Sequence, residues 1–99
     1  MKRFIVLIQS GTPEQDLAFK EFLKPDHLLW WHWIAGSWLV IDQSGGLTSG
    51  KLLNKLADTY PGLDTMVFEI PHGDTWSGYG PTKPPESFFS WIREYWDKG

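Results

Sequence analysis

The stretch LLWWHWIAGSWLVID, residues 28–42, decides the fold that we expect for this chain. Two runs rich in aromatic and β-branched residues flank Ala35-Gly36, and glycine tolerates the positive φ of a tight turn, so the stretch predicts a β-hairpin. It contains Trp30, Trp31, Trp33 and Trp38. Because side chains alternate along a strand, a two-residue turn places Trp31, Trp33 and Trp38 on one face and Trp30 on the other. A slip of the turn by one residue would regroup them.

The remaining elements follow from the residues on either side of the hairpin. A continuous apolar run at 4–8 predicts a buried strand, and Thr12-Pro13 with Gln15 predicts a capped helix start. We expect Thr48 or Ser49 to cap a second helix, residues 66–70 to form another strand, and Pro84-Pro85-Glu86 to open a last helix. The order β-α-β-β-α-β followed by a helix is that of a ferredoxin-like α+β fold, in a single domain spanning residues 1–99.

The hairpin is apolar on both faces, although the two crossover helices of such a fold cover only one face of the sheet. We expect strands 4–8 and 38–41 at the centre, with 28–34 and 66–70 at the edges. Three coverings of the second face compete: the final helix or a second copy, a stacked ligand or single-stranded nucleic acid, and a different protein. We favour the first, because the last helix carries an apolar stripe of Phe88, Trp91, Ile92 and Tyr95. The expected interface residues are Trp30, His32, Trp33, Trp91 and Trp96.

The composition excludes several classes of function. The chain has 99 residues, a formal net charge of −3 and no cysteine. Without cysteine there is no disulfide, no thiolate metal site and no cysteine nucleophile. The acidic balance disfavours nucleic acid as a partner. The apolar run from 28 to 41 is too short to span a bilayer, so we expect a cytoplasmic protein with no cofactor and no membrane association.

The loop PHGDTWSGYGPTKPP, residues 71–85, holds the candidate binding residues, since long irregular loops are often functional. They are His72, Asp74, Trp76 and Tyr79. His72 and Asp74 would form an acid/base or metal pair; alternatively, Trp76 and Tyr79 anchor an irregular connection, which is the interpretation that we favour. Ser44-Gly45-Gly46 resembles a phosphate-binding turn but lacks the lysine of a P-loop. We assign no catalytic residue and no metal ligand.

Four segments together resemble the SinR-like branch of the CRISPR-associated small nuclease superfamily. They are WHWIAGSWLV, DTMVFEI, TWSGYGP and FFSWIREYW. The resemblance implies a ferredoxin-like homodimer that packs through its sheet edges and last segment. Nuclease members carry a metal-binding aspartate at the end of the first strand, where this chain has the neutral Gln9, so the resemblance does not extend to nuclease activity.

These observations predict a non-catalytic homodimer that acts as an interaction or assembly module, with a protein partner as a further option. The resemblance alone suggests a bacterial or phage defence, or toxin–antitoxin, context. The alternative is a metal-dependent nuclease or phosphodiesterase, or a nucleotide-binding protein, that uses the turn at 44–48 or the pair His72 and Asp74.

Overall fold

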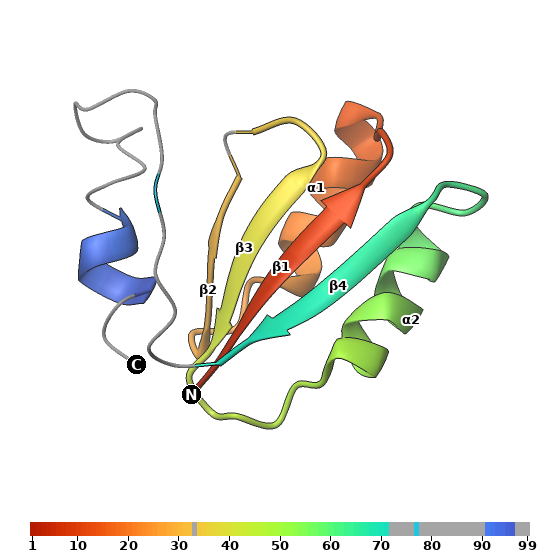
Figure 1. Cartoon of the computed structure of the whole chain (residues 1–99). Coiled ribbons are helices and arrows are strands. Elements are labelled where there is room, and N and C mark those ends of the chain that lie inside the picture. The colour runs from red at the N-terminus through yellow and green to blue at the C-terminus, as the bar shows by residue number, and fades with distance from the viewer. Residues whose placement is uncertain (33, 72–76, 78–90, 97–99) are drawn as a thin grey trace.

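The computed structural model describes residues 1–32, 34–71, 77 and 91–96. The elements are β1 (Lys2–Ile8), α1 (Pro13–Phe22), β2 (Leu28–Trp31), β3 (Ser37–Asp42), α2 (Ser49–Thr59), β4 (Thr65–Ile70) and the short π-helix η1 (Ile92–Trp96). The four strands form one antiparallel sheet in the order β2-β3-β1-β4. The ferredoxin-like βαββαβ order is thus confirmed, with β1 and β3 at the centre (Figure 1).

Both helices begin where their capping residues predict. Thr12 accepts a hydrogen bond from the backbone N–H of Gln15, and the Gln15 side chain accepts one from the Thr12 N–H, which completes the expected capping box. Thr48, and not Ser49, caps α2 by accepting from the Lys51 N–H. These caps satisfy N–H groups that have no partner within the helix.

The main core lies between the sheet and the two helices. Phe4, Val6 and Ile8 of β1 are buried there, and Trp38 and Val40 of β3 lie beside them. The helices and the residues that cap their C-terminal ends contribute Phe19, Leu23, Leu52, Leu56 and Tyr60. Phe19 meets Trp38 edge to face, with ring centroids 4.9 Å apart. This face of the sheet is therefore closed.

The predicted register of the hairpin is wrong by one residue. Trp30 opposes Val40 and Trp31 opposes Leu39, because five residues separate β2 from β3 and the connection includes a turn from Ile34 to Ser37. The slip moves Trp30 to the helix-covered face, where its ring lies 5.5 Å from that of Trp38. Trp31 is buried on the opposite face. Trp33 lies outside the described residues, and β2 ends at Trp31 and not at residue 34.

The second face of the sheet is partly covered by η1. Ile92 and Trp96 pack against Ile41, beside the half-buried Ile5, Leu29, Leu39, Ile70 and Trp91. The predicted stripe needs correction, since Trp96 and not Tyr95 lies with Ile92 on the buried side, whereas Tyr95 is exposed. Phe88 lies outside the described residues.

Arg3 ties this terminal segment to the first strand. It is 2% exposed, and its guanidinium donates to the carbonyl oxygens of Trp96, at 3.0 Å, and of Pro71. The guanidinium also lies 5.2 Å from the centroid of the Trp96 ring. A buried cation thus holds both ends of the described chain together.

Candidate interaction surface

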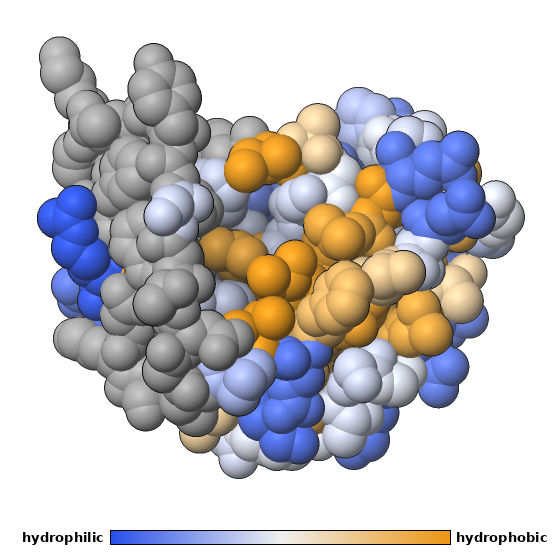
Figure 2. Space-filling view, viewed as in Figure 1, coloured by the Kyte–Doolittle hydropathy of each residue, from blue (hydrophilic) through white to orange (hydrophobic). Residues whose placement is uncertain are grey.

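The part of the second face that η1 leaves open is an apolar strip on β1 and β4. Leu7 is 38% exposed, Met66 52% and Phe68 48%. We call these three residues the open strip. The sheet places them together, because Leu7 opposes Met66 and Phe68 opposes the half-buried Ile5. In Figure 2 a continuous hydrophobic area crosses this face between a hydrophilic rim and the grey atoms.

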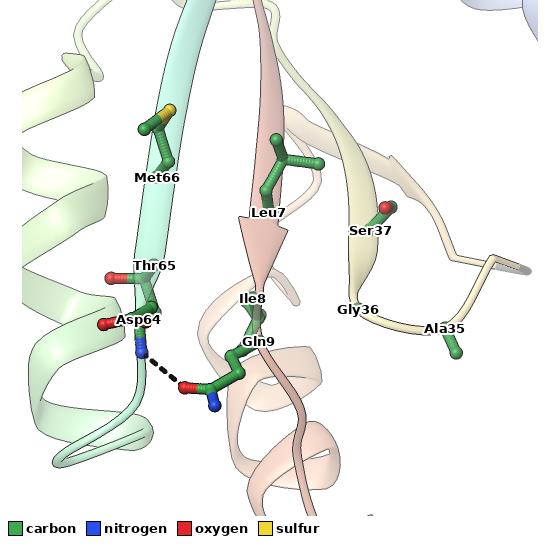
Figure 3. A pocket seen from close by; sticks show the side chains of 9 residues that line it. All are labelled: Leu7, Ile8, Gln9, Ala35, Gly36, Ser37, Asp64, Thr65 and Met66. Atoms are coloured by element: carbon green, nitrogen blue, oxygen red, sulfur yellow. Dashed lines mark hydrogen bonds between the residues drawn. The ribbon is translucent and has the colours of Figure 1, made fainter.

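A hollow of about 360 Å³ lies at one end of the open strip, beyond the last residue of β1. Its lining comes from three segments: Leu7 to Gln9, Ala35 to Ser37 and Asp64 to Met66. Figure 3 shows Leu7 and Met66 at its rim, on adjacent strands. The hollow therefore adjoins the open strip, with which it shares Leu7 and Met66.

Gln9 directly follows the last residue of β1 and is bonded to the segment before β4. Its backbone N–H donates to the Asp64 carbonyl oxygen at 2.8 Å, and its side-chain Oε1 accepts from the Asp64 N–H at 3.2 Å (Figure 3). Both bonds join the end of β1 to the start of β4. The uncharged Gln9 side chain therefore has a structural role, since it links the residue after β1 to the residue before β4.

A second polar cluster joins the hairpin to both helices. His32 lies flat on Trp38, with ring centroids 3.7 Å apart, and its Nδ1 is 2.8 Å from the Ser37 carbonyl oxygen. Because that oxygen accepts, Nδ1 carries the proton. The His32 Nε2 lies 3.8 Å from the Asp16 carboxylate. These contacts of His32 all lie within the chain, although His32 was among the residues expected at an interface.

Tyr60 completes this cluster by donating to Asp16 Oδ1 at 2.7 Å. Burial raises the pKa of the Tyr60 phenol well above its usual value, and the bond to Asp16 raises it further. A Cβ at Gly11 would lie 2.7 Å from the Tyr60 ring, so the absence of a side chain at Gly11 lets the ring lie there. The sequence offers no spacing signal for this cluster, because His32, Asp16 and Tyr60 come from three separate elements.

The donors of the turn at 44–48 are bonded to the carboxylate of Asp42, a residue of the same chain. The Asp42 carboxylate accepts from the Ser44 N–H at 2.9 Å, from the Ser44 hydroxyl at 2.6 Å and from the Leu47 N–H at 2.6 Å. These donors are the ones that a phosphate would use. Asp42 is buried at the end of β3, so the turn is a closed structural loop.

The residues that the sequence predicted for binding or for an interface lie in different parts of the molecule. His72, Asp74, Trp76 and Tyr79 lie outside the described residues. Trp30 lies half-buried beside the core under the helices, whereas Trp91 and Trp96 pack on the second face. The open strip was not predicted, although the alternation of Met66, Phe68 and Ile70 in β4 was readable as one face of a strand.

Comparison with known protein families, with curated proteins and with solved structures finds no match to this chain. Within the described ranges, no three His, Asp or Glu side chains cluster in a way that could hold a metal ion. In that same part of the chain, no helix has the length and apolar character needed to cross a membrane. The resemblance to the SinR-like branch stays a prediction.

Proposed function

We propose that the chain is an interaction module that forms a homodimer through its open strip. The observation that carries this proposal is the exposure of Leu7, Met66 and Phe68 side by side on the sheet. Contiguous apolar surface rimmed by polar residues marks interaction sites in soluble proteins. Methionine and aromatic residues are also enriched in interfaces, where lysine and glutamate are depleted.

The internal contacts of the candidate polar sites support an interaction role over an enzymatic one. Gln9 is bonded to the backbone of Asp64, and Asp42 uses the donors of the turn after β3. His32 and Tyr60 both meet Asp16. Each of these groups therefore has a structural partner, whereas the open strip has exposed apolar surface to bury.

Light scattering coupled to size-exclusion chromatography tests the proposal. We expect a mass of twice 11.4 kDa at micromolar concentration. Phe68→Glu should reduce the mass to that of one chain, because a carboxylate buried without a partner is unfavourable. A wild-type chain that stays monomeric at 100 µM (roughly the upper end of a weak but specific complex, with Kd near 10⁻⁴ M) would refute self-association.

Leu53→Glu is the matched control. Leu53 is also an exposed apolar residue, at 42%, but it lies on α2 and outside the open strip. This variant should keep the mass of the wild type. If both variants become monomeric to the same extent, the added charge and not the open strip explains the result.

A further inference from the structure

We infer that two copies join by pairing their β4 strands antiparallel about a two-fold axis at Val67, so that the two sheets become one sheet of eight strands. This inference rests on the proposed function and adds the geometry of the interface. It also gives a role to the outer edge of β4, whereas the proposed function would hold without any pairing of strands.

The first observation is that β4 is an edge strand. In the described part of the chain it pairs with β1 on one side only, over six consecutive residue pairs without a bulge (Figure 1). Exposed edges are templates for pairing with another chain, and proteins usually block them with lysine, proline, bulges or very short strands. Within β4 there is neither lysine nor proline, and the strand has 6 residues against 4 for the other edge strand, β2.

The second observation is the direction of the backbone groups of β4. The Gln9 N–H donates to the Asp64 carbonyl oxygen, so Asp64 points its carbonyl towards β1. Because this direction alternates along an antiparallel strand, Met66, Phe68 and Ile70 also bond to β1. Thr65, Val67 and Glu69 then direct their N–H and C=O groups to the free edge. No strand among the described residues pairs with these groups, so they can bond to a second copy.

The third observation is that β4 is complementary to itself in the register centred on Val67. Val67 then faces Val67 of the second copy, and Thr65 faces Glu69, so a hydroxyl can donate to a carboxylate and no like charges meet. On the open face Met66 faces Phe68 in a non-hydrogen-bonded pair, in which side chains are closest. Each Phe68 side chain then packs against Met66 of the second copy, so the pairing buries part of both open strips where the two β4 strands meet.

Glu69→Pro tests the edge pairing. The exposed Glu69 directs its N–H away from β1, so proline removes a donor that has no acceptor among the described residues of the monomer. We expect a folded monomer by light scattering and circular dichroism, whereas Glu69→Thr, which keeps the N–H, should stay dimeric. If the wild type is dimeric and folded Glu69→Pro is dimeric too, the edge pairing is wrong and the proposed function survives. A monomeric wild type would overturn both.

Cysteine cross-linking tests the register and does not depend on the proline variant. The chain has no cysteine of its own. In the proposed register residue 66 lies about 4.5 Å (Cα to Cα) from residue 68 of the second copy, within reach of a disulfide. Mixing Met66→Cys with Phe68→Cys in a glutathione buffer should therefore yield a covalent dimer that contains both chains. The mixed pair retains one native Met66–Phe68 contact.

Each cysteine variant alone should cross-link weakly, because equivalent residues of the two copies lie diagonally, at about 7–8 Å. Leu53→Cys mixed with Met66→Cys is the control for random collision, since Leu53 lies on α2. A mixture of Met66→Cys and Phe68→Cys that cross-links no faster than this control would overturn the register.

Discussion

Asp42 shows how a single buried charge organises a loop. Burial by itself would raise the pKa of Asp42, but hydrogen bonds from the Ser44 hydroxyl, the Leu47 N–H and the Ser44 N–H together hold it below its ordinary value of 3.8. A carboxyl group with a depressed pKa stabilises the fold above its unfolded pKa. That contribution is lost as the pH falls through the lower, folded value.

Asp42→Asn should therefore lower the free energy of unfolding by about 1–3 kcal/mol near neutral pH, since an amide cannot accept all three bonds. The difference between wild type and variant should stay constant above about pH 4 and shrink below it. Urea titrations from pH 2 to 7 measure it. Ser44→Ala, which keeps the carboxylate but removes one donor, should show a smaller dependence on pH. A difference that grows in acid would contradict this account.

Gly36 and Gly62 illustrate two different reasons why a position requires glycine: a positive φ and a lack of space for a side chain. Both have positive φ, at 76° and 79°, but a Cβ at Gly36 would lie 2.5 Å from the Ile8 carbonyl oxygen, whereas nothing lies within 4 Å at Gly62. Gly62→Ala should cost about 1–2 kcal/mol from the backbone conformation alone. Gly36→Ala adds an overpacking term and should cost about 2–5 kcal/mol. Thermal or urea unfolding of the two variants compares them, and equal losses would exclude the steric contribution.

At the scale of elements, η1 shows that the type of helix and its packing determine which side chains of one turn are buried. An ideal α-helical stripe groups Ile92 with Tyr95, and this grouping proved wrong. Residues 92–96 form a π-helix, whose wider turn moves Tyr95 away from the side of Ile92 and keeps Trp96 on it. Arg3 then bonds the Trp96 carbonyl and lies against its ring.

Alanine substitutions in η1 test this assignment. Ile92→Ala should lower the free energy of unfolding by about 2–5 kcal/mol, because Ile92 is buried on the sheet. Tyr95→Ala should change it by about 0.5 kcal/mol or less, as expected for an exposed residue. Chemical denaturation measures both. A larger loss at Tyr95 than at Ile92 would restore the α-helical stripe and contradict the packing described here.

At the scale of the whole molecule, a dimer links stability to concentration. If folded chains associate and unfolded chains do not, the Tm must rise with protein concentration. We expect this rise for the wild type between about 1 and 100 µM, a hundredfold range that corresponds to about 2.7 kcal/mol of binding free energy. Differential scanning calorimetry measures it. Phe68→Glu should show a Tm that does not depend on concentration, and a wild-type Tm that is equally constant would argue against association.

The amino-acid sequence by itself determined the fold class, since its signals for this fold are local. The apolar run of β1, the capping box of α1 and the β-rich runs around Gly36 each act within a few residues, and together they predicted the order and the central strands. The candidate sites in residues 72–79 stayed predictions, as did the homodimer.

Only the tertiary structure decided which face each tryptophan takes and where apolar surface remains exposed. The length of the connection between β2 and β3 moved Trp30 to the helix side, because a shift of one residue reverses every side chain of a strand. The contacts of Asp16 with His32 and Tyr60 cross three elements. The open strip of Leu7, Met66 and Phe68 exists because η1 covers one half of the second face and leaves the other half exposed.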